Sequence, residues 1–183
     1  MTNLQTLDTK RKLRDALRAK AAQKRRFGLP FYQPHPKQEM FHAAGDFKRR
    51  YVRTGNRFGK YDMGAAEDCP WSIGERPFFP VGDPRRTLGI PCRATKGLII
   101  CQDWDKAQEI FTSEEDGIGR GKLLKFLPDL RRSKDDTSPG IVRVKKNASG
   151  ITQLYVRSIH DGDISTIYLD TVKSFKLDGM SQE

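Results

Sequence analysis

The sequence contains no long apolar segment. None of its hydrophobic runs approaches the roughly 18–20 residues that a membrane-spanning helix needs, and the basic N-terminus lacks the apolar stretch of a signal peptide. Cysteine is also scarce: Cys69, Cys92 and Cys101 are an odd number and lack metal-ligand spacing. These absences argue against a membrane partner, a disulfide framework and a zinc site, and they predict buried or idle thiols in a reducing compartment.

The sequence also lacks an apolar segment that ends in an Asp-Glu pair. ATP-hydrolysing P-loop enzymes use such a strand, because its Asp helps to hold Mg²⁺ and its Glu orients the attacking water. Two apolar segments, residues 98–103 and 167–170, each end in a single acid, Asp103 and Asp170. Each fits a metal ligand by pattern, but we expect each to cap or turn the chain at the end of a strand.

Basic residues outnumber acidic ones by 34 to 23, and the excess is concentrated near the N-terminus. Residues 10–26 hold nine Lys or Arg and one acid, whereas the rest of the chain is mildly basic. Good helix formers over residues 8–24 predict a basic helix with a narrow apolar stripe. Such a helix could contact nucleic-acid phosphates, dock on an acidic partner or simply be solvated. The candidate nucleic-acid contacts are Lys10, Arg11, Arg14, Arg18, Lys24, Arg25 and Arg26.

Apolar spacing and capping residues predict four further helices. Pro36 stands where the first of them begins, a favourable position for proline, and Pro70 is expected to end the second. Asp103 is a candidate N-cap for the third. The predicted helices cover residues 37–44, 62–69, 104–111 and 122–127.

Strand patterns occupy the middle and the end of the chain. Residues 97–103 form a continuous apolar run of the kind that is buried in parallel sheets. Three later segments are rich in β-forming residues and separated by turn residues, which predicts consecutive strands paired as hairpins. These segments are residues 140–144, 153–157 and 165–169. Together the elements predict an α/β fold.

Residues 53–61 nearly spell a phosphate-binding P-loop. The general pattern is G-x-x-x-x-G-K-[ST], in which backbone N–H groups surround phosphates, the Lys reaches them and the hydroxyl binds Mg²⁺. Gly59 and Lys60 fit this pattern, whereas Thr54 replaces the first Gly and Tyr61 replaces the hydroxyl residue. A short β-prone segment, residues 49–53, precedes the loop. The alternative is a tight turn shaped by glycine, with Lys60 a solvated surface lysine.

Three stretches of the chain resemble the ATPase domain of the large terminase subunits of tailed phages, which are DNA-packaging motors. The stretches are residues 37–42, 53–60 and 63–67, and Gly-Asn-Arg-x-Gly-Lys is a characteristic form of the family's P-loop. The resemblance covers roughly residues 30–183. It implies an incomplete sheet of the P-loop NTPase type with flanking helices and C-terminal β-hairpin strands. Residues 1–29 would then be a basic helical segment, and residues 30–183 a partial ATPase domain.

The resemblance also implies the residues of a nucleotide site. Gln38 would contact the adenine of ATP, Lys60 the β and γ phosphates, and Arg57 the γ phosphate, so that Arg57 and Lys60 are the candidate catalytic residues. The implied partners are double-stranded DNA, the portal of the procapsid and the small terminase subunit, in the host cytoplasm. The candidate ATP contacts are Gln38, Thr54, Gly55, Asn56, Arg57, Phe58, Gly59, Lys60 and Tyr61.

Two departures from the family pattern concern the metal. The phenol oxygen of Tyr61 lies too far from its Cβ to take the place of a Ser or Thr hydroxyl, and the sequence stops before the expected Asp-Glu strand. We therefore expect an N-terminal piece of such a motor that hydrolyses ATP poorly by itself. The alternative is a non-enzymatic protein that binds nucleic acid through its basic helix.

Overall fold

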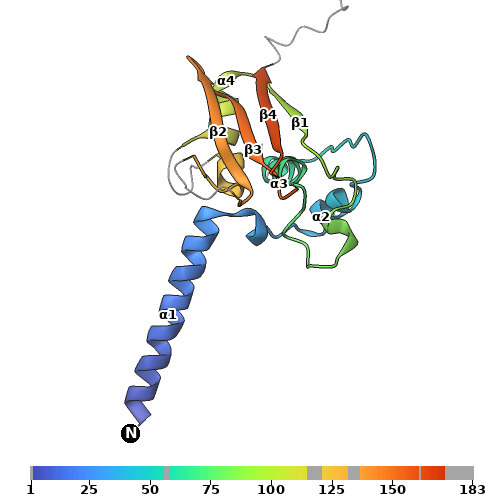
Figure 1. Ribbon diagram of the computed structural model, residues 1–183. Helices are drawn as coiled ribbons and strands as arrows, with labels where there is room; N and C mark the ends of the chain where they lie inside the picture. Colours follow the sequence, from blue (N-terminus) through green and yellow to red (C-terminus); the bar gives the residue numbers. More distant parts are fainter. Residues whose placement is uncertain (1, 56–57, 115–120, 132–136, 161, 172–183) are drawn as a thin grey trace, which may run out of the picture.

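The computed structural model describes residues 2–55, 58–114, 121–131, 137–160 and 162–171. Its centre is a four-stranded sheet with helices packed against it, which confirms the α/β class (Figure 1). The strand order is β1-β4-β3-β2. β1 and β4 are parallel, and the other two pairs are antiparallel. The strands are β1 (Lys96–Cys101), β2 (Gly140–Asn147), β3 (Gly150–Arg157) and β4 (Ile164–Thr171).

The consecutive C-terminal strands are confirmed as hairpins. β2 and β3 pair along their length, with Asn147 opposite Gly150, and β3 continues into an antiparallel pairing with β4. The predicted burial of the strand at residues 97–103 is wrong. β1 is an edge strand whose Leu98 and Ile100 are 49% and 43% exposed. Of its apolar residues, Ile99 and Cys101 pack against the core, and its outer edge carries no strand among the described residues.

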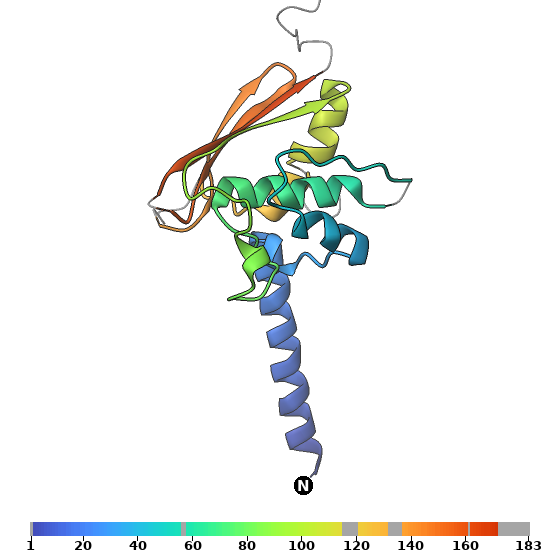
Figure 2. The same ribbon diagram turned by 90° about the vertical axis from the view of Figure 1, so that its right-hand side faces the viewer.

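The helices cover one face of the sheet (Figure 2). α3 (Lys60–Ile73), the short α4 (Trp104–Ala107) with the π-helical turn that continues it (Gln108–Thr112), and α5 (Lys122–Phe126) contribute to one apolar core. Asp103 caps α4 as predicted, since its carboxylate accepts a hydrogen bond from the Lys106 N–H at 2.8 Å. The fully buried residues of this core include Leu29, Ala65, Ala66, Cys69, Leu123, Leu127, Ile141, Leu154 and Val156.

α3 does not end at Pro70, so that prediction is wrong. Pro70 lies inside the helix, where it has no N–H to donate to the preceding turn. The last turn nevertheless buries Cys69 and Ile73, and the Ile73 carbonyl accepts a hydrogen bond from the Ile159 N–H at 2.8 Å. These contacts offset the backbone hydrogen bond that Pro70 cannot make. The helix ends at Gly74, whose φ of 104° is a conformation that favours glycine.

The N-terminal helices have the predicted positions. α1 (Thr2–Arg26) extends away from the rest of the molecule, and its described side chains from Asp8 to Lys24 are exposed (Figures 1 and 2). A 3-10 turn, η1 (Leu29–Phe31), leads to α2 (Pro36–Ala43), which begins at Pro36 as expected. Within the described part of the chain, every helix is too short or too polar to cross a membrane.

Gly64 inside α3 and Gly74 at its C-cap provide a matched test of this architecture. A Cβ at Gly74 would lie 2.6 Å from the His160 ring, and the backbone there has positive φ. We therefore expect Gly74→Ala to lower the free energy of unfolding by about 1–3 kcal/mol. Gly64→Ala should raise it by about 0.5–1 kcal/mol, because Gly64 lies mid-helix with open space beside it. Urea denaturation measures both, and equal effects would contradict the assigned C-terminus of α3.

Candidate functional site

The glycine loop leads directly into the N-terminus of α3, as the P-loop pattern predicts. Gly59 is the N-cap residue, with φ 73° and ψ 31°, and Lys60 is the first helical residue. The Met63 N–H donates to the Gly59 carbonyl at 2.9 Å, which closes the first turn. Among the described residues, no side chain caps this end of the helix. The first N–H groups of α3 are therefore available to an anionic ligand.

The segment before the loop differs from the prediction. Residues 49–55 form no strand, and Tyr51 is 89% exposed. The chain is anchored instead by Arg50, whose guanidinium donates to Glu67 Oε1 at 2.8 Å and to the Phe41 carbonyl at 3.1 Å. The same guanidinium lies 4.5 Å from the centre of the Phe41 ring. Residues 49–55 are therefore held by the contacts of one side chain and not by strand pairing.

The predicted nucleotide contacts lie close together but differ in their surroundings. Lys60 is exposed, with Nζ 5.5 Å from the centre of the Tyr61 ring, and Tyr61 packs edge-on against Phe111. Thr54 and Phe58 are half-buried, and Gly55 is exposed. Asn56 and Arg57 lie outside the described residues.

Lysines of α5 approach the same end of α3. Asp62, in the first turn of α3, lies 3.2 Å from Lys122 Nζ and 3.6 Å from Lys125 Nζ. These lysines offset the charge that Asp62 would otherwise place beside an incoming anion. The start of α3 therefore combines free N–H groups with three nearby ammonium groups, counting Lys60.

Gln38 is bonded to the loop itself. Its Nε2 donates to the Phe58 carbonyl at 3.0 Å and lies 3.5 Å from the Gly59 carbonyl. Its Oε1 accepts from the His35 N–H at 3.1 Å and from the Tyr32 hydroxyl at 3.2 Å. The side-chain amide is thus fully engaged within the chain, while the adenine contact stays a prediction.

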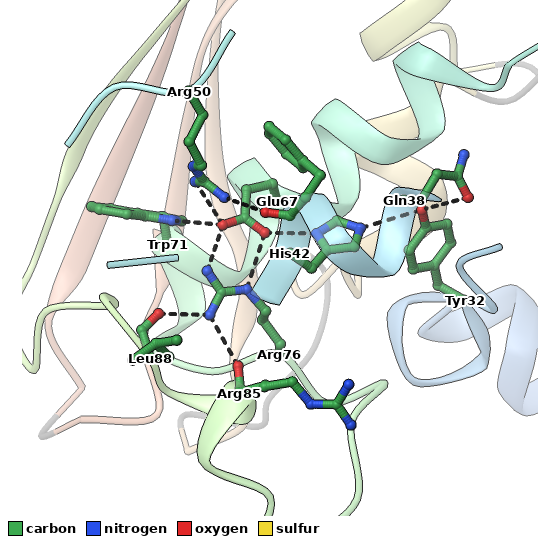
Figure 3. A network of polar contacts seen from close by, with 10 residues as sticks. Tyr32, Gln38, His42, Arg50, Glu67, Trp71, Arg76, Arg85 and Leu88 are labelled. Carbon is green, nitrogen blue, oxygen red and sulfur yellow. Dashed lines mark hydrogen bonds and ion pairs between the residues drawn. The ribbon is translucent and has the colours of Figure 1, made fainter. Parts of the chain in front are cut away.

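Behind Gln38 lies a buried network centred on Glu67 of α3 (Figure 3). His42 of α2 is fully buried, and its Nδ1 lies 2.8 Å from Glu67 Oε2 while its Nε2 lies 3.3 Å from the Tyr32 hydroxyl. The other carboxylate oxygen accepts from Arg50 and from the Trp71 indole N–H at 3.3 Å. The network therefore connects α2, α3 and the segment before the loop.

Arg76 supplies the deepest charge in this network. Its side chain has no exposed surface and donates to both oxygens of Glu67. It also donates to the carbonyls of Arg85 at 3.1 Å and Leu88 at 2.8 Å. This single guanidinium therefore fastens the turn-rich segment after α3 to the helix. That segment contains the 3-10 helix η2 (Pro84–Arg86).

The network sets the protonation of its members. Burial alone would raise the pKa of Glu67, but hydrogen bonds from His42 and Arg76 and the charges of Arg76 and Arg50 lower it to about 2. Burial, with smaller contributions from Asp62 and Glu67, raises the pKa of the Tyr32 hydroxyl. Burial and the charge of Glu67 raise the pKa of Asp68 to about 7, and Arg50 opposes this rise. Glu67 is thus a permanent anion at neutral pH, and Tyr32 a permanent donor.

Sequence reasoning missed this network. His42, Arg50, Glu67 and Arg76 belong to separate segments, and only the fold brings them together. One signal was present: Glu67 shares the apolar face of α3 with Met63, Ala66 and Pro70. A carboxylate on a buried helix face requires paired charges.

Five of the predicted nucleic-acid contacts, together with Lys20, form a charged face on α1, whereas the predicted contact Arg26 falls in the opposite half of the helix. At about 100° per residue, six basic residues fall within one half of the helix, while Asp8 and Asp15 fall in the other half. Asp8 pairs there with Lys12 at 2.8 Å. The side chain of Arg25 lies outside the description. The six basic residues are Lys10, Arg11, Arg14, Arg18, Lys20 and Lys24.

Comparison with protein-family models, with curated proteins and with solved structures finds no match to this chain. Among the described residues, no group of three or more His, Cys, Asp or Glu is arranged to hold a metal ion.

The pKa of Glu67 leads to a prediction for acid stability. Because its folded pKa is about 2 and its ordinary value is 4.5, its contribution is fully present above pH 4.5 and is lost as the pH falls towards 2. Glu67→Gln should flatten this dependence. At pH 7 it should lower the free energy of unfolding by about 3–5 kcal/mol, because the buried Arg76 loses its counter-ion.

Glu114→Gln is the matched control, since Glu114 also binds two basic residues, Lys146 and Arg131, but its side chain is 43% exposed. It should cost about 0–1 kcal/mol at pH 7. Urea titrations between pH 2 and 7 measure both variants. If both variants lowered the free energy of unfolding equally at pH 7, burial of the Glu67 charge would not explain its contribution to stability.

Proposed function

We propose that the start of α3 binds the phosphates of a nucleotide. We propose further that the chain is the N-terminal ATP-binding part of a DNA-packaging motor subunit of the large terminase type. The observation that carries the proposal is the backbone at Gly59 and Lys60. A glycine with positive φ turns the chain into α3, and the lysine of the motif is the first residue of that helix. A glycine turn that enters a helix at a lysine is the helix side of a phosphate loop, and residues 49–55 before it form no strand.

Charge and exposure support the same site. Free N–H groups and the positive end of the helix dipole favour an anion at this position. Lys60 is exposed beside them, and Lys122 and Lys125 stand next to Asp62 in the first turn. ATP would therefore be held by its phosphates through backbone N–H groups and ammonium groups.

Mg²⁺ fits this site poorly. The residue at the metal position is Tyr61, whose ring packs against Phe111 with 6.2 Å between ring centres. A phenol held there cannot replace a Ser or Thr hydroxyl on Mg²⁺, and the sequence holds no apolar segment ending in Asp-Glu. We therefore assign nucleotide binding to this chain, and we expect little ATP turnover from it alone. DNA translocation, and contacts with the portal and the small terminase subunit, would belong to the assembled motor.

Lys60→Ala tests the nucleotide site. Removing the ammonium group should raise the Kd for ATP at least about ten-fold, because a charge-assisted contact to phosphate is lost. Lys48→Ala is the control. Lys48 is also an exposed lysine, and its replacement removes the same charge outside the loop. Isothermal titration calorimetry gives both values. An equal Kd for Lys60→Ala and Lys48→Ala would refute the site.

A second candidate function is non-enzymatic binding of nucleic acid through α1. The observation that favours it is the segregation of charge, with six basic residues on one half of an exposed helix and both acids on the other. A helix of this kind can neutralise several phosphates without reading bases. In an intact motor the same helix would contact the double-stranded DNA.

Two double variants of α1 test this function. Lys10→Gln/Arg14→Gln removes charges from the basic half, and Lys12→Gln/Arg26→Gln removes the same number from the opposite half. The first should reduce the slope of log Kd against log salt by about two units, at about 0.9 per phosphate contact. The second should leave the slope near that of the unmodified chain. Fluorescence anisotropy with a DNA duplex measures it, and identical slopes for the two variants would contradict a specific basic face.

A further inference from the structure

We propose that Gln38 is a positioning residue that fixes the peptide groups of Phe58 and Gly59, so that the N–H groups at the start of α3 are presented to a ligand. The inference rests on the proposed nucleotide site and identifies what prepares that site. It assigns Gln38 a role within the chain, through contacts to the loop backbone.

A phosphate-binding turn must direct its N–H groups towards the ligand and its carbonyls away from it. The carbonyls of Phe58 and Gly59 face Gln38 Nε2, at 3.0 and 3.5 Å. Gln38 is only 5% exposed, so the Phe58 carbonyl points towards the interior, and the Gly59 carbonyl also accepts from the Met63 N–H of α3. The Phe58 side chain is also held in place, because the His35 ring packs against it edge-on with 4.6 Å between the ring centres.

The orientation of the Gln38 amide is determined by its partners. Nε2 faces two carbonyls, which can only accept, while Oε1 faces the His35 N–H, which can only donate. If the amide were flipped, its oxygen would face the two carbonyls and its NH2 group would face the His35 N–H, and neither pair can form a hydrogen bond. The side chain at position 38 must therefore donate on one side and accept on the other.

The buried network supports Gln38 from behind. The Tyr32 hydroxyl lies between Gln38 Oε1 and His42 Nε2, and His42 contacts Glu67 through its other nitrogen. Because Glu67 belongs to α3, the hydrogen bonds run from the turn before that helix to its middle. α2 is therefore held in place relative to the turn that it positions.

Gln38→Glu separates positioning from general stability. The new side chain has the same shape as Gln38, and its carboxylate can still accept from the His35 N–H and the Tyr32 hydroxyl. It cannot donate to the Phe58 carbonyl, and its charge repels that oxygen. We expect the Kd for ATP to rise about ten-fold. Gln33→Glu is the matched control, because Gln33 is exposed and the same charge is added near α2. Its Kd should stay within about two-fold of that of the unmodified chain.

Amide ¹⁵N order parameters of Phe58, Gly59 and Lys60 provide a readout that needs no nucleotide. In Gln38→Glu they should fall from the value of rigid backbone, about 0.85, to below about 0.6, while those of the sheet stay unchanged. Unchanged order parameters and unchanged ATP affinity in Gln38→Glu would overturn the positioning role. If the unmodified chain binds no ATP, the proposed function fails, and the order parameters alone then decide the role of Gln38.

Discussion

The carboxylate of Glu67 lies in the interior, and the segments around it are arranged to neutralise it. A buried charge costs several kcal/mol unless it is paired and hydrogen-bonded. Here Arg76, Arg50, His42 and Trp71 all contact it, and they come from four different parts of the chain. The positions of α2, of the segment before the loop and of the turns after α3 therefore depend on one anion.

α3 transmits this constraint to the proposed site. Its buried face packs against the sheet and α5, its middle carries Glu67, and its first residue is Lys60. The loop is thus fixed from two directions, by the helix that it starts and by Gln38 behind it. A rigid turn loses little entropy when a ligand binds, so such a frame favours phosphate binding.

Local patterns predicted most elements, because caps, periodicity and turn residues act over a few positions. α1, α2, α5 and the three C-terminal strands follow from such patterns. The errors arose where tertiary contacts decide: Pro70 lies within α3, β1 is an exposed edge, and residues 49–55 are held by Arg50 instead of a strand. The glycine turn and the helix that follows it could be predicted from the sequence. The Glu67 network could not, because its partners are distant in the chain.

The central claim is that the turn before α3 binds nucleotide phosphates. Its most direct test is a titration of the ¹⁵N-labelled chain with ATP, followed through the backbone amide resonances. If this turn binds phosphates, the largest shifts will belong to Gly59, Lys60 and Tyr61, at the free N–H groups of α3. Shifts confined to the basic face of α1, or no saturable shifts, would contradict it.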